Sequence, residues 1–243
     1  MNVGRTARER VRAELIREIT ETARRQLATD GAAGLSLRAV AREMGMVSSA
    51  IYRYFPSRDD LLTTLIIDGY NAVGAAVEKA DAAWPAEDYA GRWLTACRAA
   101  RAWALAHPHE YALVYGSPVP GYQAPERTIA PASRVAAVFG KIISEAYRAG
   151  AAGAPEPATE HAGRATPGLR VPESFVPDAA RLRDAILAGV PDEVAAGALI
   201  AWSGLFGLVS FELFGQFENV VTDRAAFFDH AAARLGLLTG LPA

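Results

Sequence analysis

The sequence predicts an all-α fold with two parts, a three-helix head at residues 1–60 and a larger helical bundle at residues 61–243. Apolar residues recur at helical spacing over most of the chain, and no run alternates as a half-buried strand would. Proline and glycine also divide the chain into segments of helical length. Two short segments on either side of Gly45 are close enough to form a helix-turn-helix.

The composition is that of a globular chain. Apolar residues make up 51% and charged residues 21% of the 243 positions, which excludes a disordered or collagen-like chain. Residues 1–55 carry 10 Arg against 6 Asp and Glu, whereas the remaining residues carry 15 Lys and Arg against 21 Asp and Glu. This distribution is typical of a head that binds a polyanion, and equally of ordinary surface charge.

Cysteine usage and the N-terminal residues predict a cytoplasmic protein. Cys97 is the single cysteine, so the chain can form no internal disulfide and no zinc site made of thiolates. The arginine-rich start is followed by no apolar stretch, which is not typical of a secretory signal.

Residues 6–29 have the pattern of an amphipathic helix. Thr6 and Glu9 form a capping-box pattern at its start, and Asp30-Gly31 is a stop signal. The apolar residues at steps of four share one stripe that we expect to face the core: Val11, Leu15, Ile19, Ala23 and Leu27.

The next segments predict a pair of short helices and a long one. Ser36 is placed to cap a helix from Leu37 to Met44, and Gly45 tolerates the positive φ of a tight turn. Residues 48–55 have the length of two helical turns, and Pro56 ends them. Ser57 and Asp60 then form a cap for a helix that reaches Ala82.

The pattern stays helical beyond Ala82, where Trp84-Pro85 interrupts the chain. Two stretches rich in proline and glycine, 116–125 and 151–177, are expected to be loops. The expected helices are 88–106, 109–115, 126–149, 178–188, 192–217 and 222–237.

The segment from Gly34 to Leu62 carries three spaced features. These are Ala-x-Glu-x-Gly ending at Gly45, Tyr52-x-x-Phe55, and Ser-x-x-x-Leu-Leu ending at Leu62. With them, residues 8–62 resemble the DNA-binding segment of the TetR family of transcriptional regulators. The resemblance implies a homodimer that binds a palindromic double-stranded DNA operator, most often as a repressor. It also implies a small-molecule effector bound among the C-terminal helices.

Spacing within residues 48–55 sets which side chains can reach DNA. Ile51 and Phe55 are four apart and should face the core, which directs Tyr52 and Arg53 away from it. The resemblance places Ser48, Ser49 and Ala50 nearest the bases and Arg38 on a base or phosphate. It places four more residues on the DNA backbone: Ser36, Tyr52, Tyr54 and Arg58.

The chain departs from the family pattern at Val47, where members often have Ser or Thr. Valine has no side-chain acceptor, so Ser48 is expected to cap the helix in its place.

The segment from Val194 to Phe211 contains 18 residues without a charge, which is near the length of a membrane span. Acidic rather than basic residues flank it, and small residues such as Gly197 and Gly204 suit close helix contact. We therefore expect no membrane span, but a core helix or a homodimer interface within residues 192–237.

Aromatic residues after residue 60 predict either a cavity for a flat organic ligand or ordinary core packing. Cys97 is included because it lies four residues after Trp93 and so shares its face of the helix. The candidate pocket residues are Trp93, Cys97, Trp103, Tyr111, Tyr115, Phe139, Trp202 and Phe206. Loop 151–177 is expected to be a connector, or a segment that folds over the ligand entrance.

No pattern in the sequence predicts catalysis, a cofactor or a metal. His107 and His109 flank Pro108, which removes helical ligand spacing, and no nucleophile motif or phosphate loop is present. The alternatives are an enzyme or small-molecule binding protein that retains the head, and a structural DNA-associated protein without a ligand. An apolar cavity in the bundle would distinguish a ligand-responsive regulator from the latter.

Overall fold

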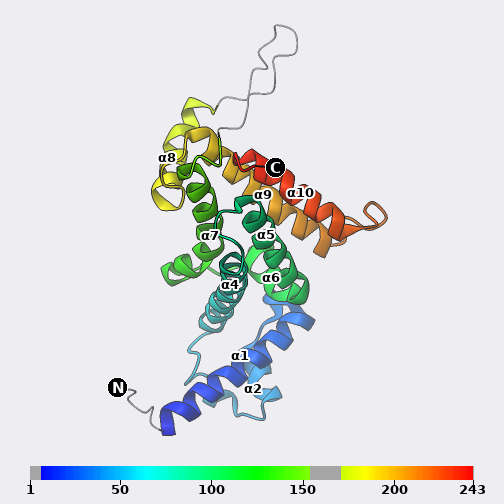
Figure 1. The fold of residues 1–243 in the computed structure, drawn as a ribbon. Coiled ribbons are helices and arrows are strands. Elements are labelled where there is room, and N and C mark those ends of the chain that lie inside the picture. The colour runs from blue at the N-terminus through cyan, green and yellow to red at the C-terminus, as the bar shows by residue number, and fades with distance from the viewer. Residues whose placement is uncertain (1–6, 154–170, 243) are drawn as a thin grey trace. The chain divides into compact units, whose positions relative to one another are not determined.

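The computed structural model describes residues 7–153 and 171–242, and within these ranges the chain is helical, with no strand (Figure 1). The predicted all-α fold is confirmed. Cα packing divides the chain into two compact units. The first consists of Met1–Asn71 with His107–Pro131, and the second of Ala72–Ala106 with Ala132–Ala243. The first unit therefore includes the start of the long helix and the short helix after His107.

The first unit contains the predicted head. Its helices are α1 (Ala7–Gly34), α2 (Leu37–Glu43), α3 (Ser48–Ile51), the start of α4 (Arg58–Ala82), α6 (Pro108–Tyr115) and the 3-10 turn η1 (Glu126–Thr128). The predicted stop at Gly31 is present as a break in α1, because Gly31 has φ 67°. Thr6 of the predicted first cap lies outside the described residues.

The core of this unit confirms most of the predicted stripe on α1. Ile19, Ala23 and Leu27 are buried and pack with residues of α2, α3 and α4. Val11, at the other end of the stripe, is 60% exposed. The predicted caps also form: Ser36 Oγ accepts from Ala39 N–H, and Ser57 Oγ accepts from Asp60 N–H at 3.1 Å.

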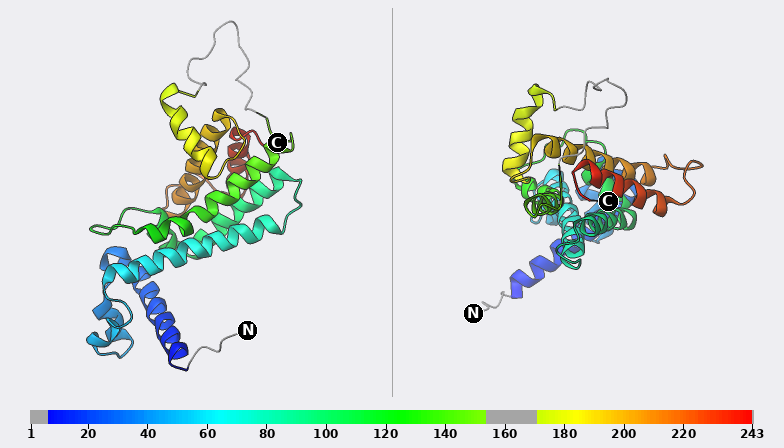
Figure 2. Two further views of the ribbon diagram at one scale, coloured as in Figure 1. Left: turned by 90° about the vertical axis from the view of Figure 1, so that its left-hand side faces the viewer. Right: turned by 45° about the horizontal axis from the view of Figure 1, so that its top comes forward.

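The second unit contains the rest of α4 and a bundle around α9. Its other helices are α5 (Tyr89–Ala106), α7 (Ile129–Arg148), η2 (Glu173–Phe175), α8 (Val176–Ala185), α9 (Asp192–Leu213) and α10 (Arg224–Leu238). α9 packs on α10, α8 and α5, and both views in Figure 2 show α9 and α10, in orange and red, side by side. The first three residues of α7 belong to the first unit.

The end of α9 and the start of α8 differ from the prediction, and one backbone hydrogen bond joins the residues after α7 to those after α10. α9 ends at Leu213 instead of residue 217, because Phe214 closes the helix and Gly215 has φ 78°. α8 begins at Val176, inside the predicted loop 151–177, of which residues 154–170 lie outside the described part. Gly153 N–H donates to Gly240 O at 3.1 Å, close to the buried Thr239 and Leu241.

Among the described helices, α9 is the one long and apolar enough to cross a membrane by length and composition. One third of its most apolar window is buried within the chain. Leu199, Ile200 and Phe211 remain exposed on it.

Candidate nucleic-acid interface and ligand cavity

The turn between α2 and α3 is closed by backbone hydrogen bonds. Gly45 has φ 66°, a conformation that favours glycine, and its N–H donates to Arg42 O at 3.1 Å. Met46 N–H donates to Ala41 O at 2.8 Å. Val40 and Ile51, both fully buried, hold the two helices on the core, so the predicted helix-turn-helix is present.

α3 is shorter than predicted. The α-helix covers Ser48–Ile51, and the prediction of a two-turn helix to Phe55 is wrong in its second half. Arg53 N–H donates to Ala50 O at 3.2 Å and Tyr54 N–H to Ile51 O at 2.9 Å, which is the tighter spacing of a 3-10 turn. Phe55 N–H also donates to Ile51 O at 3.0 Å, and Pro56 stops any further extension because it restricts the backbone of the residue before it.

The side chains of residues 48–55 that face the core, and those that face away from it, are the ones predicted. Ile51 and Phe55 are buried, whereas Tyr52 is 43% exposed and Arg53 is exposed. Ser48 and Ser49 are exposed, and Ala50 and Tyr54 are half-buried.

The predicted cap at Ser48 is wrong. Val47 occupies the N-cap position without a side-chain hydrogen bond, and Ser48 is the first helical residue. The reason is the backbone: Val47 has the extended conformation of an N-cap, and its carbonyl accepts from Ala50 N–H at 2.8 Å.

The arginines of the head fall into two groups. One group is neutralised by carboxylates: Arg24 pairs with Asp68 at 2.8 Å and Arg25 with Glu43 at 2.9 Å. The other group forms no ion pair among the residues that the structure describes, and it includes Arg12, Arg38, Arg42 and Arg53, besides Arg8 and Arg10 near the start of α1.

Members of the second group lie on α2 and beside α3. Arg38 and Arg42 are exposed in the first and last turns of α2, four residues apart and hence on one face. Arg12 lies over the ring of Tyr54 at 5.2 Å and donates to Arg53 O at 3.3 Å. Arg12 and Arg42 are not among the DNA contacts that the sequence predicted, although the four-residue spacing of Arg42 from Arg38 indicates a shared face.

Arg58 has a different environment from the other predicted DNA contacts. Its guanidinium donates to Leu35 O at 3.1 Å and Ala32 O at 2.7 Å, and it is 3.6 Å from Asp59. These contacts join the start of α4 to the segment that links α1 and α2. Ser36 is half-buried at the cap of α2.

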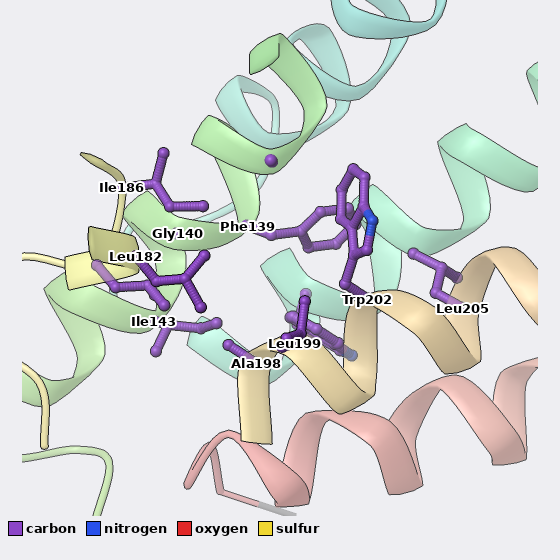
Figure 3. Close-up of a pocket in the computed structure, with 12 residues that line it drawn as sticks. Phe139, Gly140, Ile143, Leu182, Ile186, Ala198, Leu199, Trp202 and Leu205 are labelled. Atoms are coloured by element: carbon purple, nitrogen blue, oxygen red, sulfur yellow. The ribbon is translucent and has the colours of Figure 1, made fainter. Parts of the chain in front are cut away.

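In the second unit, three of the predicted aromatic residues line one cavity. Trp93, Phe139 and Trp202 come from α5, α7 and α9, with ring centroids 4.9 Å apart for Trp93–Phe139 and 6.4 Å apart for Phe139–Trp202. Figure 3 shows residues that line this cavity. Its volume is about 130 Å³. The remaining lining residues are Ala136, Gly140, Ile143, Leu182, Ile186, Leu187, Ala198, Leu199 and Leu205.

The other predicted pocket residues lie elsewhere. Phe206 packs on Trp202 with ring centroids 4.6 Å apart, outside the lining set. Cys97 and Trp103 are buried in α5 and do not line the cavity. Tyr111 and Tyr115 belong to α6 of the first unit, where Tyr115 packs against Tyr70 at 5.8 Å.

A buried charge cluster holds the last turn of α4. Arg92 on α5 donates to Asp81 Oδ1 at 2.7 Å and to Glu145 of α7 at 2.9 Å, and Lys141 of α7 is 3.4 Å from Asp81. Burial raises the pKa of the Asp81 carboxyl, but Arg92 and Lys141 together hold that pKa below its ordinary value. The cluster adjoins the cavity in sequence, because Arg92 precedes Trp93 and Lys141 follows Gly140.

Within the described ranges, no three His, Cys, Asp or Glu side chains gather in a way that could hold a metal ion. His107 caps α6 and His109 is exposed in its first turn.

Comparisons with known proteins agree along the chain. Residues 19–65 match the family model "Bacterial regulatory proteins, tetR family", and residues 93–235 match "Tetracyclin repressor-like, C-terminal domain". The HTH-type transcriptional regulators Rv1816 of Mycobacterium tuberculosis and Mb1846 of Mycobacterium bovis are each 38% identical over 232 residues. That alignment covers 93% of this chain and 90% of each relative.

Solved structures show the same likeness. The regulatory protein SCO4313 is 34% identical, with a TM-score of 0.74 over 95% of this chain and 98% of that one. PfmR, a TetR family regulator from Thermus thermophilus, is 16% identical, with a TM-score of 0.55 over 93% of this chain and 99% of that one, and shares the fold.

Proposed function

Because the chain belongs to the TetR family and is a DNA-binding transcriptional regulator, not an enzyme, we propose that it is an effector-responsive repressor of a palindromic operator. In this proposal residues 1–60 form the DNA-binding domain and residues 61–243 the domain for dimerisation and effector binding. The regulator acts in the cytoplasm, where its DNA is.

The observation that carries the proposal is the group of unneutralised arginines beside the helix-turn-helix. Arg38, Arg42 and Arg53 are exposed and free of carboxylate partners in the described part of the chain, so phosphates can pair with them. Ser48, Ser49 and Ala50 lie at the start of α3, where short side chains allow a close approach to base edges. Ser36, Tyr52 and Tyr54 would contact the DNA backbone, whereas the Arg58 donors are already bonded to carbonyls.

We propose that two copies associate through α9 and α10, as members of this family typically dimerise. These helices and their connection carry an exposed apolar set: Leu199, Ile200, Phe211, Phe214, Val220, Phe227, Leu237 and Leu238. A two-fold interface of this kind would present two α3 segments to successive major grooves, which requires a separation of about 34–36 Å.

Effector binding in the cavity would weaken DNA binding through α4. This helix begins at Arg58, directly after the helix-turn-helix, and its last turn is held by Arg92, the neighbour of the cavity residue Trp93. A change at the α5 and α7 walls would therefore reach Asp81 and shift α4. A tenfold loss of operator affinity needs a coupling free energy of only about 1.4 kcal/mol.

A gel-shift titration with duplex DNA from upstream of its own gene tests the proposal. We expect a specific, salt-dependent complex with two chains per operator, at lower protein concentration than with a scrambled duplex. Equal binding to both duplexes, or no binding at low ionic strength, would contradict the function.

A further inference from the structure

We propose that the effector is a small, uncharged, mainly hydrocarbon molecule of about the size of one aromatic ring. This inference rests on the proposed function, in which the cavity between α5, α7, α8 and α9 holds the effector. It adds the chemical class of the ligand, which follows from the walls of the cavity, its volume and the charges near it.

The walls are almost entirely apolar. Every one of the 12 lining residues has a hydrocarbon or aromatic side chain or is glycine, and none carries a charge (Figure 3). The indole N–H of Trp93 is already used, because it donates to Ala232 O at 2.8 Å. The indole N–H of Trp202 is the side-chain donor that remains in the lining. Such a lining stabilises apolar ligand surface and offers an ionic group no charged side chain to replace its hydration.

The charged groups closest in sequence to the lining residues are paired with one another. Lys141, next to Gly140, contacts Asp81, and Arg183, next to Leu182, contacts Asp192. Arg92, next to Trp93, is held by Asp81 and Glu145. A carboxylate or ammonium ligand would therefore have to break one of these pairs or remain unpaired, and both are unfavourable.

The volume indicates how large a group the apolar walls can surround, and the cavity is open where Leu199 is 40% exposed. A cavity of about 130 Å³ is close to the roughly 150 Å³ of an engineered apolar cavity that binds benzene. Ala136 and Ala198 leave this space, since larger side chains there would fill it. Gly140 is itself fixed, because a Cβ would lie 2.3 Å from Ile186 O.

The aromatic walls favour a ring as the occupant. Phe139 and Trp202 meet nearly at right angles, with an interplanar angle of 79°. A flat guest can pack against the edge of one ring and the face of the other, which is the geometry that aromatic groups prefer.

Calorimetric titration of the full-length protein with toluene, benzoate, benzylamine and anthracene tests the class. We expect saturable binding of one toluene per chain, and at least tenfold weaker binding of benzoate and benzylamine because of their charge. Anthracene, three fused rings, should also bind at least tenfold more weakly because it exceeds the volume. The inference would be overturned if benzoate or benzylamine bound as tightly as toluene, if anthracene bound more tightly than toluene, or if toluene did not bind.

Two cavity-filling variants locate the site. Ala136→Leu should weaken toluene binding at least tenfold, and its control is Ala137→Leu on the exposed face of the same helix. Ala198→Leu fills the same space from α9 and serves if Ala136→Leu does not fold, as judged by thermal melting. Unchanged toluene affinity in a folded filling variant would place the ligand elsewhere.

The same samples separate this inference from the function. A gel shift with and without toluene reports operator release. Operator binding without any response to toluene would overturn the ligand class alone. Toluene binding by a protein that ignores every duplex would overturn the proposed repressor and leave the apolar site in place.

Discussion

At the scale of single residues, the arginines of the head are divided by their neighbours. Arg24 and Arg25 form ion pairs that join α1 to α4 and to α2, respectively, so their charges are neutralised within the fold. Arg38 and Arg42 have no such partner in the described part of the chain. The head is therefore electropositive where α2 and α3 present their polar side chains, and not uniformly over its surface.

Tyr52→Ala should weaken operator binding about tenfold and leave the fold intact. The side chain is 43% exposed, so its loss removes a hydrogen bond to phosphate of about 1.5 kcal/mol without opening the core. Fluorescence anisotropy with labelled operator measures the affinity, and Leu105→Ala, which is 40% exposed in the second unit, is the control. Wild-type affinity in Tyr52→Ala would remove this residue from the interface.

Arg38→Ala should flatten the salt dependence of operator binding. One lost phosphate contact reduces the slope of log affinity against log salt by about 0.9. The control is Arg148→Ala, which removes the same charge from an exposed position on α7. A slope unchanged from wild type would show that Arg38 does not contact phosphate.

The sequence predicted which side chains of this segment face the core, but it did not predict the hydrogen bonds that the side chains form. Ile51 and Phe55 face the core because a four-residue step returns to the same side of a helical turn. Arg58 could not be placed in this way, because its carbonyl partners at Ala32 and Leu35 are 26 and 23 residues away in the sequence. Their proximity depends on the packing of α4 against the end of α1.

At the scale of elements, helix ends marked by glycine, proline or a capping side chain were predicted well. α2 and α4 begin after Ser36 and Ser57 as expected, because a serine hydroxyl replaces a missing backbone acceptor. The end of α3 was not predicted correctly. A proline limits how far a helix can extend, but it does not fix how tightly the last turn is wound. The cavity was predicted only in its aromatic members, because aliphatic residues such as Leu182 have no signature that separates cavity lining from ordinary core.

Arg92→Met should destabilise the second unit by about 3 kcal/mol at neutral pH. The guanidinium and the Asp81 carboxyl are both almost fully buried, so the variant leaves the buried carboxylate with only the longer contact to the exposed Lys141. Urea unfolding measures the loss. The control is Arg98→Met, whose partner Asp229 is partly exposed, and for which a loss below about 1 kcal/mol is expected.

The same pair predicts an acid dependence. The folded-state pKa of Asp81 lies below its unfolded value, so its contribution to stability is complete above about pH 4 and is lost as the pH falls further. Arg92→Met should lose this part of the acid sensitivity. If the unfolding free energy changed equally steeply with pH in the wild type and in Arg92→Met, the proposed contribution of the Asp81–Arg92 pair to acid sensitivity would be contradicted.

At the scale of the whole molecule, the predicted all-α architecture and the family are confirmed, because both depend on periodicity and on a local motif. The division into packing units was harder to foresee. α6 lies near residue 110 in the sequence but packs on α1, and such a long-range contact leaves no periodic trace.

Ile200→Glu should produce a monomer and reduce operator affinity by at least a hundredfold. The side chain is 58% exposed on α9, so the change spares the core of one chain but places two charges near the proposed two-fold axis. Sedimentation velocity measures the mass. Ile129→Glu, on a residue 61% exposed at the start of α7, should stay dimeric, and a dimeric Ile200→Glu would move the interface away from α9.

The buried residues after α10 have a practical consequence for handling the protein. Thr239 and Leu241 are enclosed, and Gly240 accepts a hydrogen bond from Gly153 with too little room for a side chain. Leu241 lines a pocket with residues of α5 and α10, so trimming the chain at Leu238 would expose apolar side chains of both helices. A long polar spacer between Leu241 and any fused segment would leave the packing of Thr239 and Leu241 intact.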